Sequence, residues 1–233
     1  MSAKDIVIKP ITAALARETI KKHHYSGKVV QNSSLHLGVY YNGFLEGALQ
    51  FGPSLDKSKV IGLVKNTSWN GFIELNRMAF SDNLPRNSES RAIAISMMLI
   101  KKNYPHIKWV LSFADATQSG DGTIYRAAGF KLIGINKNKT LYQFPNGAII
   151  ANMTLTANSI TPAVLKLCDD LGVPRKARSI AEWRELGGKP LEGFQLRYIY
   201  FLDKTCENNL AVPVLDYSEI QKRGAAMYKG VRK

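Results

Sequence analysis

The residues with the clearest chemical potential follow a short apolar run at Trp109–Leu111. Ser112 comes directly after this run, Asp115 follows it closely, and a polar, glycine-containing loop leads to a helix opened by Gly122–Tyr125. A hydroxyl and a carboxylate therefore lie at the C-terminal end of a strand, the edge where ligands bind in open α/β sheets. Asp115 could bind a metal ion or accept a proton, and the Tyr125 phenol could act as a general acid. Ser112 is expected to support the site as a hydrogen-bond donor, because no nucleophile elbow surrounds it. The alternative is that Ser112 and Asp115 only cap the next element.

A second group of polar residues lies earlier in the chain. His24 and Tyr25 follow the first predicted helix, and His23 is expected to be a bystander. A lone histidine such as His24 is otherwise explained as a surface or packing residue. Glu74 and Arg77 lie three residues apart on a predicted strand, so their side chains are expected on opposite faces. Arg77 could bind a phosphate or carboxylate, or it could form a structural salt bridge.

Hydrophobic periodicity and turn residues predict the elements that position these side chains. Thr12 is the expected N-cap of the first helix, and Asn42-Gly43 is the expected turn of a hairpin. In chain order the expected elements are a helix over 12–22, strands over 35–41, 44–51, 60–65 and 71–80, a helix over 91–103, a strand over 107–113, a helix over 123–128, a closing strand pair over 131–135 and 140–144, helices over 161–171 and 179–186, a strand over 195–202 and a last helix over 217–227.

The length of 233 residues, 45% of them hydrophobic, suits one large domain or a domain with an appendage. The sequence pattern changes near residue 150. This change predicts a catalytic core over residues 1–150 and an extension over 151–233 that completes the domain and contacts DNA. No apolar run reaches the ~18 residues of a membrane helix, and no apolar signal segment follows the N-terminus. We therefore expect a cytoplasmic protein with no membrane partner. Cys168 and Cys206 lack metal or redox spacing and predict two reduced, mostly buried thiols.

The charge of the chain indicates a polyanionic partner. Thirty-two Lys and Arg residues oppose 18 Asp and Glu, a net charge of +14, and nucleic acid is the first candidate partner. The basic segment with Arg175, Lys176 and Arg178 is expected to contact the DNA backbone, as is Arg197. Tyr198 could stack on a flipped base, although packing in the core is the competing explanation.

The order of elements, with Leu84–Ser90 running into a helix, resembles the GNAT N-acyltransferase fold. The resemblance implies an α/β (α+β) protein whose central mixed, mostly antiparallel sheet is flanked by helices, with a C-terminal extension of helices and a strand. It also implies that backbone N–H groups at the helix start bind the pyrophosphate of coenzyme A. The glycine-rich form of that loop is absent. The residues expected to bind the cofactor are Arg77, Arg86, Asn87, Ser88, Ser90 and Arg91.

A narrower resemblance covers about residues 20–205. The chain is similar to the Mom proteins of bacteriophage Mu and related phages and prophages. The segments that carry this similarity are His24–Ser26, Glu74–Arg77, Ser112–Asp115, Gly122–Ala128 and Leu196–Leu202. In one loop the chain has Gly120-Asp121-Gly122 where the family usually has a histidine, so no role of that histidine carries over.

The Mom resemblance implies an enzyme that adds a carbamoylmethyl group to the exocyclic N6 of adenine in DNA. The modification shields phage DNA from restriction in the host bacterial cytoplasm. The resemblance implies catalytic roles for Asp115, Tyr125, His24 and Tyr25, and a metal ion, iron or another divalent ion, held by His24, Tyr25 and Asp115. The adenine must be flipped out of a duplex or be unpaired. The donor is left open between acetyl-coenzyme A and a glycine-derived donor such as an aminoacyl-tRNA.

Two other functions compete with this interpretation. An ordinary N-acetyltransferase of a protein or small amine would bind coenzyme A and ignore DNA. A non-enzymatic DNA-binding protein on a degenerate transferase fold would bind DNA without residue Asp115 and would leave no modified base.

Overall fold

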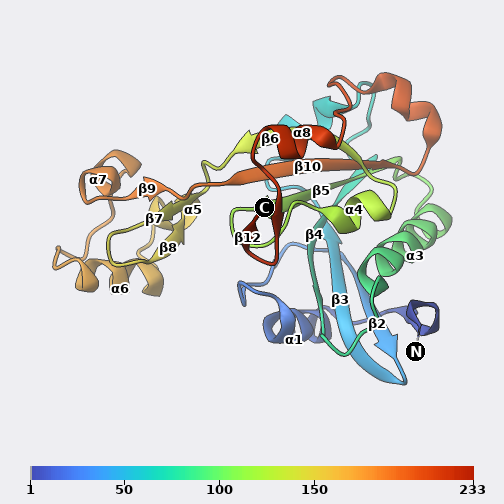
Figure 1. The fold of residues 1–233 in the computed structure, drawn as a ribbon, viewed down its shortest axis with the longest axis horizontal. Helices are drawn as coiled ribbons and strands as arrows, with labels where there is room; N and C mark the ends of the chain where they lie inside the picture. Colours follow the sequence, from blue (N-terminus) through green and yellow to red (C-terminus); the bar gives the residue numbers. More distant parts are fainter. Residues whose placement is uncertain (1) are drawn as a thin grey trace.

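A computed structural model describes residues 2–233 as a seven-stranded main sheet with helices on both faces (Figure 1). The strand order is β1-β2-β3-β4-β5-β10-β6, with β4 and β5 parallel and the other neighbours antiparallel. The strands are β1 Val7–Pro10, β2 Leu35–Tyr41, β3 Phe44–Gly52, β4 Phe72–Phe80, β5 Trp109–Ala116, β6 Lys131–Lys137 and β10 Phe194–Phe201. The predicted fold class, a mixed and mostly antiparallel sheet flanked by helices, is confirmed.

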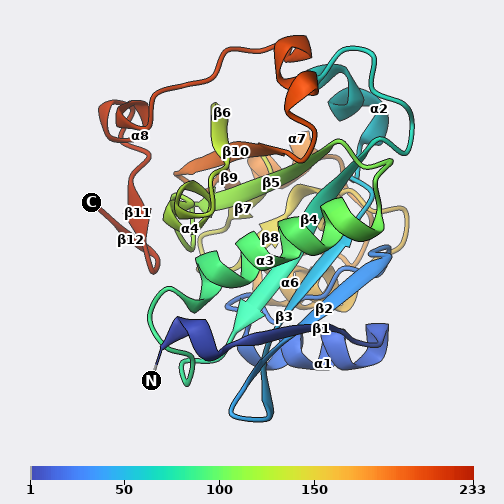
Figure 2. The ribbon, with the colours of Figure 1, turned by 90° about the vertical axis from the view of Figure 1, so that its right-hand side faces the viewer.

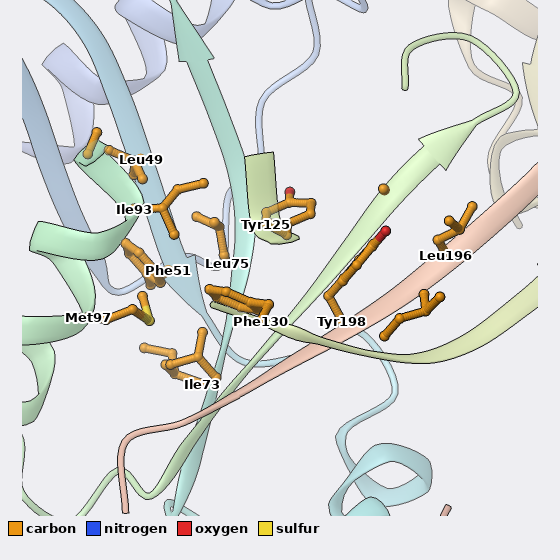
Figure 3. Close-up of a cluster of buried hydrophobic side chains, with 14 of the residues drawn as sticks. Leu49, Phe51, Ile73, Leu75, Ile93, Met97, Tyr125, Phe130, Leu196 and Tyr198 are labelled. Carbon is orange, nitrogen blue, oxygen red and sulfur yellow. The ribbon is translucent and has the colours of Figure 1, made fainter. Parts of the chain in front are cut away.

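The largest hydrophobic core lies between one face of this sheet and α3 (Ser88–Asn103). Ile93 and Met97 of α3 pack toward Phe51 and Leu75 of the sheet, with Phe130 beside them (Figure 3). The short α4 (Thr123–Ala127) covers the same face nearer to β5 and β6. Figure 2 shows α3 crossing in front of the strands.

The other face of the sheet is covered at two separate places. The helix α1 (Ala13–His23) packs Ala16 and Ile20 onto Ala48 and Ala79, and Thr12 caps it by accepting a hydrogen bond from the backbone N–H of Leu15, as predicted. Segments 57–69 and 204–212 cover the far end of the central strands around a second core. These segments contain α2 (Lys57–Val60) and the 3-10 helices η2 (Ile61–Leu63) and η3 (Lys204–Asn209). Another 3-10 helix, η1 (Ala3–Asp5), precedes β1.

Residues 138–193 form a small lobe inserted between β6 and β10, seen at the left of Figure 1. The lobe has its own core, in which the Trp183 ring is fully buried and donates from Nε1 to the carbonyl oxygen of Leu155. Its elements are β7 Leu141–Gln143, β8 Ile149–Ala151, α5 Asn152–Leu155, α6 Pro162–Asp170, α7 Ile180–Glu185 and β9 Lys189–Pro190. The chain then returns to the main sheet through β10, which lies between β5 and the edge strand β6. The division expected near residue 150 stays a prediction.

The C-terminal segment folds back onto the loop that follows β5. It contains α8 (Ser218–Lys222) and the strands β11 (Met227–Tyr228) and β12 (Val231–Arg232). The backbone N–H of Asp121 donates to the carbonyl oxygen of Met227, and that of Gly230 donates to Ser119. This segment therefore helps to fix the loop between Asp115 and α4.

Three sequence-based expectations are wrong. Residues 60–65 are mostly helical, and Val64 forms only a single bridge with Leu210. The strands near 131–135 and 140–144 do not pair with each other, because β10 takes the place beside β6. The last helix ends near Lys222, since Gly224 adopts a positive φ just beyond it. The predicted hairpin around Asn42-Gly43 is confirmed, and α3 begins at Ser88, slightly earlier than expected.

Both cysteines are free thiols, Cys168 buried and Cys206 partly buried. Within residues 2–233, no helix combines the length and apolar character needed to span a bilayer.

Gly122 gives a test of how the start of α4 is packed. A Cβ atom there would lie 2.5 Å from Cε2 of Tyr198, and the backbone φ is +82°. We expect Gly122→Ala to lower the free energy of unfolding by about 1–3 kcal/mol, since both strain and overpacking oppose it. Gly120→Ala is the matched control, because its Cβ would meet nothing closer than 3.7 Å. Urea unfolding of both variants tests this, and equal stabilities would contradict the packing described.

Candidate active site

The site lies where β4 and β5 separate. The two strands pair only from Phe72 with Trp109 to Leu75 with Ser112, although both continue further. β5 remains paired with β10 as far as Ala116, and β4 remains paired with β3 as far as Phe80, so each strand keeps its outer neighbour where the two part. Figure 1 shows β4 and β5 diverging from their common end. The separation leaves a wedge-shaped space between β4 and β5 beyond Leu75 and Ser112, here called the wedge. Backbone groups and side chains of both strands face it.

A β-bulge in β4 changes which side chains face this wedge. Gln50 of β3 pairs with Arg77, but the next residue of β3 pairs with Leu75, so Asn76 is the extra residue. Leu75 and Met78 both contact the large core on the α3 face. Glu74 and Arg77 therefore share the opposite face. The expectation that they point to opposite faces is wrong, because a bulge shifts the alternation of the strand.

Asp115 and Tyr25 meet across this wedge. The Tyr25 phenol donates to Oδ2 of Asp115 at 2.8 Å, although the two residues are 90 positions apart. The other oxygen, Oδ1, accepts from the backbone N–H of Thr117 at 2.9 Å and from its hydroxyl. Burial, and then the Asp115 charge, raise the pKa of Tyr25 well above its usual value. The phenol is therefore a stable donor at neutral pH, and it holds the carboxylate in one orientation.

His24 lies against Arg77 and is uncharged. Its Nε2 is 3.3 Å from Nη1 of Arg77, and its Nδ1 is 2.9 Å from the Ser26 hydroxyl. Its ring also stacks on Tyr25 with centroids 4.3 Å apart. Burial and the Arg77 charge lower the pKa of His24 to about 4, and the Asp115 charge opposes them. A guanidinium can only donate, and the backbone N–H of Ser26 points at Nδ1 at 3.1 Å, so both ring nitrogens face donors and a second ring proton is disfavoured.

Arg77 has free hydrogen-bonding capacity inside the site. Its Nε is buried and has no partner among residues 2–233, and no ion pair joins it to Glu74 within that range. The alternative of a structural salt bridge therefore has no support in the geometry. Burial raises the pKa of Glu74, and contacts with Ser54 and Asn76 offset part of the rise. An unpaired buried guanidinium is suited to a carbonyl or anionic group of a ligand.

Tyr125 reaches the same wedge from the α3 face. Its phenol lies 3.4 Å from the carbonyl oxygen of Phe113, with the buried Ser112 side chain beneath it. Burial raises the pKa of Tyr125 to about 12, and the Ser112 hydroxyl lowers it slightly. The Tyr198 ring packs 5.3 Å from Tyr125 and is fully buried, with its hydroxyl on the carbonyl oxygen of Asp121. Tyr198 supports Tyr125 and cannot stack on a base without leaving the core.

Most of the predicted cofactor residues gather at the start of α3. The N-cap Asn87 has a left-handed φ of 70° and offers no side-chain cap. The N–H of Ser88 donates to the carbonyl oxygen of Pro85 at 3.1 Å, which leaves those of Glu89 and Ser90 for an anion. A cavity of about 530 Å³ lies here, and Lys4 from the N-terminal segment adds a cation to it. Ser88 is buried and does not line this cavity. Arg77 lies apart from the cavity, beside His24. Of the predicted residues, those that line the cavity are Arg86, Asn87, Ser90 and Arg91.

The basic residues predicted to contact DNA are largely paired within the inserted lobe. Arg175 binds Asp169 through Nε at 2.7 Å, and Lys176 pairs with Glu182. Arg178 is buried and donates to the carbonyl oxygens of Pro174 and Lys176. Arg178 is thus a structural residue in this conformation, while Arg175 and Lys176 remain exposed.

Arg197 differs from those residues because no acidic side chain pairs with it. Its guanidinium lies 5.8 Å from the Phe113 ring, and its Nε is buried with no partner among residues 2–233. Register places it diagonally across from Asp115, on the same face of the sheet. Arg197 is therefore available to a ligand beside the site.

The residues predicted to hold a metal ion do not fit one in this arrangement. The Tyr25 phenol is protonated and binds Asp115, and the Arg77 cation lies against the nitrogen of His24 that would face a metal. Across residues 2–233, no cluster of three or more His, Cys, Asp or Glu side chains is arranged to hold an ion. We therefore derive no step through a metal.

Comparison with known proteins identifies the class to which the chain belongs. Residues 5–219 match the Mom protein family, and the chain belongs to this family. It is similar to methylcarbamoylase Mom of Escherichia phage Mu, with 35% identity over 211 residues that cover 89% of this chain and 80% of the relative. The resemblance drawn from the sequence is confirmed.

Solved structures of acetyltransferases are more distantly similar. The ribosomal-protein-S18-alanine N-acetyltransferase of Escherichia coli is 10% identical, with 85% of this chain and 94% of that chain covered and a TM-score of 0.46. A Bacillus subtilis acetyltransferase solved with CoA is 8% identical, with 84% and 97% covered and a TM-score of 0.44.

The structure adds residues that the sequence did not single out. Thr117 orients Asp115, Ser26 faces His24, and Lys4 joins the cavity at α3. A threonine two residues after an aspartate is a local turn signal that could have suggested the first contact. The contribution of Lys4 depends on tertiary folding and has no local signal.

The neutral state of His24 gives a pH-dependent prediction. The unfolded chain takes up a proton near the ordinary pKa of 6.5, whereas folded His24 does so only near 4. His24 therefore makes the free energy of unfolding fall as the pH drops through this range. Between pH 7 and pH 5 we expect its contribution to be about 1 kcal/mol, allowing for partial exposure of the ring. In urea unfolding at pH 7 and pH 5, the free energy of unfolding should fall less for His24→Gln than for the unaltered protein. An equal fall in the two proteins would contradict the prediction.

Proposed function

We propose that this protein is a transferase that adds a carbamoylmethyl group to N6 of adenine in DNA and so shields the DNA from restriction. The observation that carries the proposal is the contact between Tyr25 and Asp115, which places an oriented carboxylate at the wedge of the sheet. Membership of the Mom family supports it, and a relative in that family is named a methylcarbamoylase. The net charge of +14 supports a nucleic acid as the acceptor.

The side chains divide the proton transfers of this reaction between them. A bond forms from N6 to the methylene carbon of the carbamoylmethyl group, and the bond from that methylene carbon to the donor's leaving group breaks. Asp115 accepts the proton that N6 loses, while Tyr25 holds the carboxylate in place. Tyr125, still protonated at neutral pH, donates a proton to the leaving group. Arg77 binds the carbonyl oxygen of the transferred group through its free Nε, and neutral His24 fixes its guanidinium.

The cavity at the start of α3 is the proposed donor site. It combines free N–H groups with Arg86, Arg91 and Lys4, a set that suits the pyrophosphate of an acyl-coenzyme A. The same chemistry would also accept the phosphates of a tRNA that carries a glycine-derived donor. Ala127 of α4 lines this cavity, and Tyr125 lies on the same helix, which supports a donor that approaches Tyr125 from the α3 face.

Nucleoside mass spectrometry of plasmid DNA from expressing cells tests the function. We expect a carbamoylmethyl adenine with the unaltered protein, and at least a hundredfold less with Asp115→Asn, the loss typical of removing a general base. Asp170→Asn is the matched control, since that carboxylate is an exposed partner of Lys166 on the inserted lobe.

Each other outcome has a definite meaning. Unmodified adenine from well-folded protein would contradict the proposal and direct attention to acetylation of amine acceptors. Full modification by Asp115→Asn would remove Asp115 from the mechanism.

Calorimetry with coenzyme A tests the donor site. We expect binding to the unaltered protein, and about thirtyfold weaker binding for the double variant with Arg86→Gln and Arg91→Gln, because each charge-assisted phosphate contact contributes about 1 kcal/mol. Arg223→Gln is the control, as this arginine pairs with Glu219 on α8. Binding that is unchanged in the double variant would place the coenzyme elsewhere, and no binding at all would favour the tRNA donor.

A further inference from the structure

A strip of the main sheet beside Asp115 lies between the two covers of the face opposite α3. α1 packs on this face at Ala48 and Ala79, and the second core buries Leu111 and Ile199. Figure 2 shows these covers apart, with α1 at the lower right and the segment with α2 at the upper right. The strip crosses the sheet between them, and its residues are all partly exposed. From β4 to β6 the strip includes Arg77, Asp115, Phe113, Arg197 and Gly134.

Strand register places Phe113 in the middle of this strip. Phe113 and Asp115 are alternate residues of β5, so their side chains share a face. Arg197 of β10 pairs directly with Phe113, and Gly134 of β6 pairs with Arg197. A Cβ on Gly134 would lie 3.5 Å from the Cβ of Arg197, so both residues face the same side. Phe113 therefore lies between the proposed general base and a guanidinium, and β6 adds no side chain at Gly134.

The strip holds two guanidinium groups with unused donors. Among the arginines of residues 2–233, Arg77 and Arg197 are the two whose buried Nε has no hydrogen-bond partner. The Arg197 guanidinium lies 5.8 Å from the Phe113 ring, near the outer limit of about 6 Å for a cation–π contact. Buried donors without partners are unfavourable, which indicates a ligand that accepts hydrogen bonds here. In the proposed reaction Arg77 binds the transferred group, so Arg197 is left for the acceptor.

A nucleotide has the chemistry that suits Phe113 and Arg197 together. Bases stack on aromatic side chains, and arginine binds phosphate through its planar set of donors. The Phe113 ring packs against the second core but is only partly buried, so part of it can receive a base. Alternate residues of a strand are about 7 Å apart. A purine centred over Phe113 therefore brings its N6 within hydrogen-bond distance, about 2.9 Å, of the Asp115 carboxylate.

We propose that the target adenine stacks on the Phe113 ring and that Arg197 binds the phosphate beside it. The proposal rests on the proposed function in taking adenine of DNA as the acceptor and Asp115 as the base. It adds the surface that holds this acceptor, on the α1 side of the sheet. The competing explanation is structural, with Phe113 only completing the second core and Arg197 only covering its ring.

Fluorescence anisotropy with single-stranded thymine oligonucleotides tests the stacking, since a single strand needs no unpairing. One oligonucleotide carries a central adenine and the other an abasic site at the same position. We expect the unaltered protein to bind the adenine form about tenfold more tightly, which is within the range of base stacking on an aromatic ring. Phe113→Leu should reduce this preference to less than twofold. Phe113→Tyr should keep it, because the ring is retained.

Tyr200→Leu is the matched control for loss of a ring. Tyr200 is a partly buried residue of the same strand pair, opposite Val110, and its ring packs 5.2 Å from Phe130 on the α3 face. We expect Tyr200→Leu to keep the tenfold preference for adenine. A structural effect of removing one aromatic ring would instead lower the affinity for both oligonucleotides alike.

Salt dependence tests the role of Arg197 independently of Phe113. We expect Arg197→Gln to weaken the binding of both oligonucleotides by a similar factor, about fivefold, and to leave the preference for adenine in place. The slope of log Kd against log salt concentration should fall by about 0.7, the value for one phosphate contact on a single strand. Arg223→Gln, whose arginine pairs with Glu219 on α8, should leave the slope unchanged.

The other outcomes would overturn the proposal. Equal affinity of the unaltered protein for the two oligonucleotides, no binding of either, or an adenine preference that survives Phe113→Leu would exclude stacking on Phe113. An unchanged slope in Arg197→Gln would exclude its phosphate contact. An adenine preference that depends on Phe113, in a protein that leaves the adenine of cellular DNA unmodified, would support this binding surface and contradict the proposed chemistry.

Discussion

The separation of β4 from β5 is the constraint on which the rest of the structure depends. Parallel strands lose hydrogen bonds when they part, so something must hold each strand in its new course. β10 holds β5, pairing with it over its full length, and the bulge at Asn76 redirects β4. In the wedge the Tyr125 phenol faces the carbonyl oxygen of Phe113, and Asp115 and Arg77 add a carboxylate and a guanidinium.

Unequal pairing of charges is the second feature of the site. Asp115 accepts three hydrogen bonds, so its carboxylate is fixed and stabilised. Arg77 keeps a buried nitrogen without a partner, and the neutral ring of His24 occupies one of its other nitrogens. A buried donor without a hydrogen-bond partner is unfavourable, so a ligand group that accepts a hydrogen bond from Nε of Arg77 would be bound favourably. Burial of the ring, and then the Arg77 charge that a protonated His24 would face, keep the pKa of His24 low.

The sequence predicted the elements whose signals are local. Thr12 as a cap, the Asn42-Gly43 turn and the alternation of β10 are each set within a few residues, and all three were found. The expectation that Tyr25 meets Asp115 came from family resemblance, since no local pattern joins residues so far apart. The bulge at Asn76 was missed, because a bulge leaves no mark in the alternation of a short polar stretch. The partner of β6 was missed because the 56 residues of the inserted lobe, 138–193, separate it from β10.

The inserted lobe shows that a basic sequence run is a weak guide to where a polyanion binds. Arg175 and Lys176 have acidic partners, and Arg178 is used to hold its own loop beneath the Trp183 ring. A paired cation must release its partner before it binds a phosphate, so its contribution to affinity is smaller than its charge suggests. Arg197 has no such partner and lies diagonally across from Asp115. Among the basic residues predicted to contact DNA, Arg197 is therefore the one whose charge has no acidic partner within residues 2–233 and lies beside the wedge.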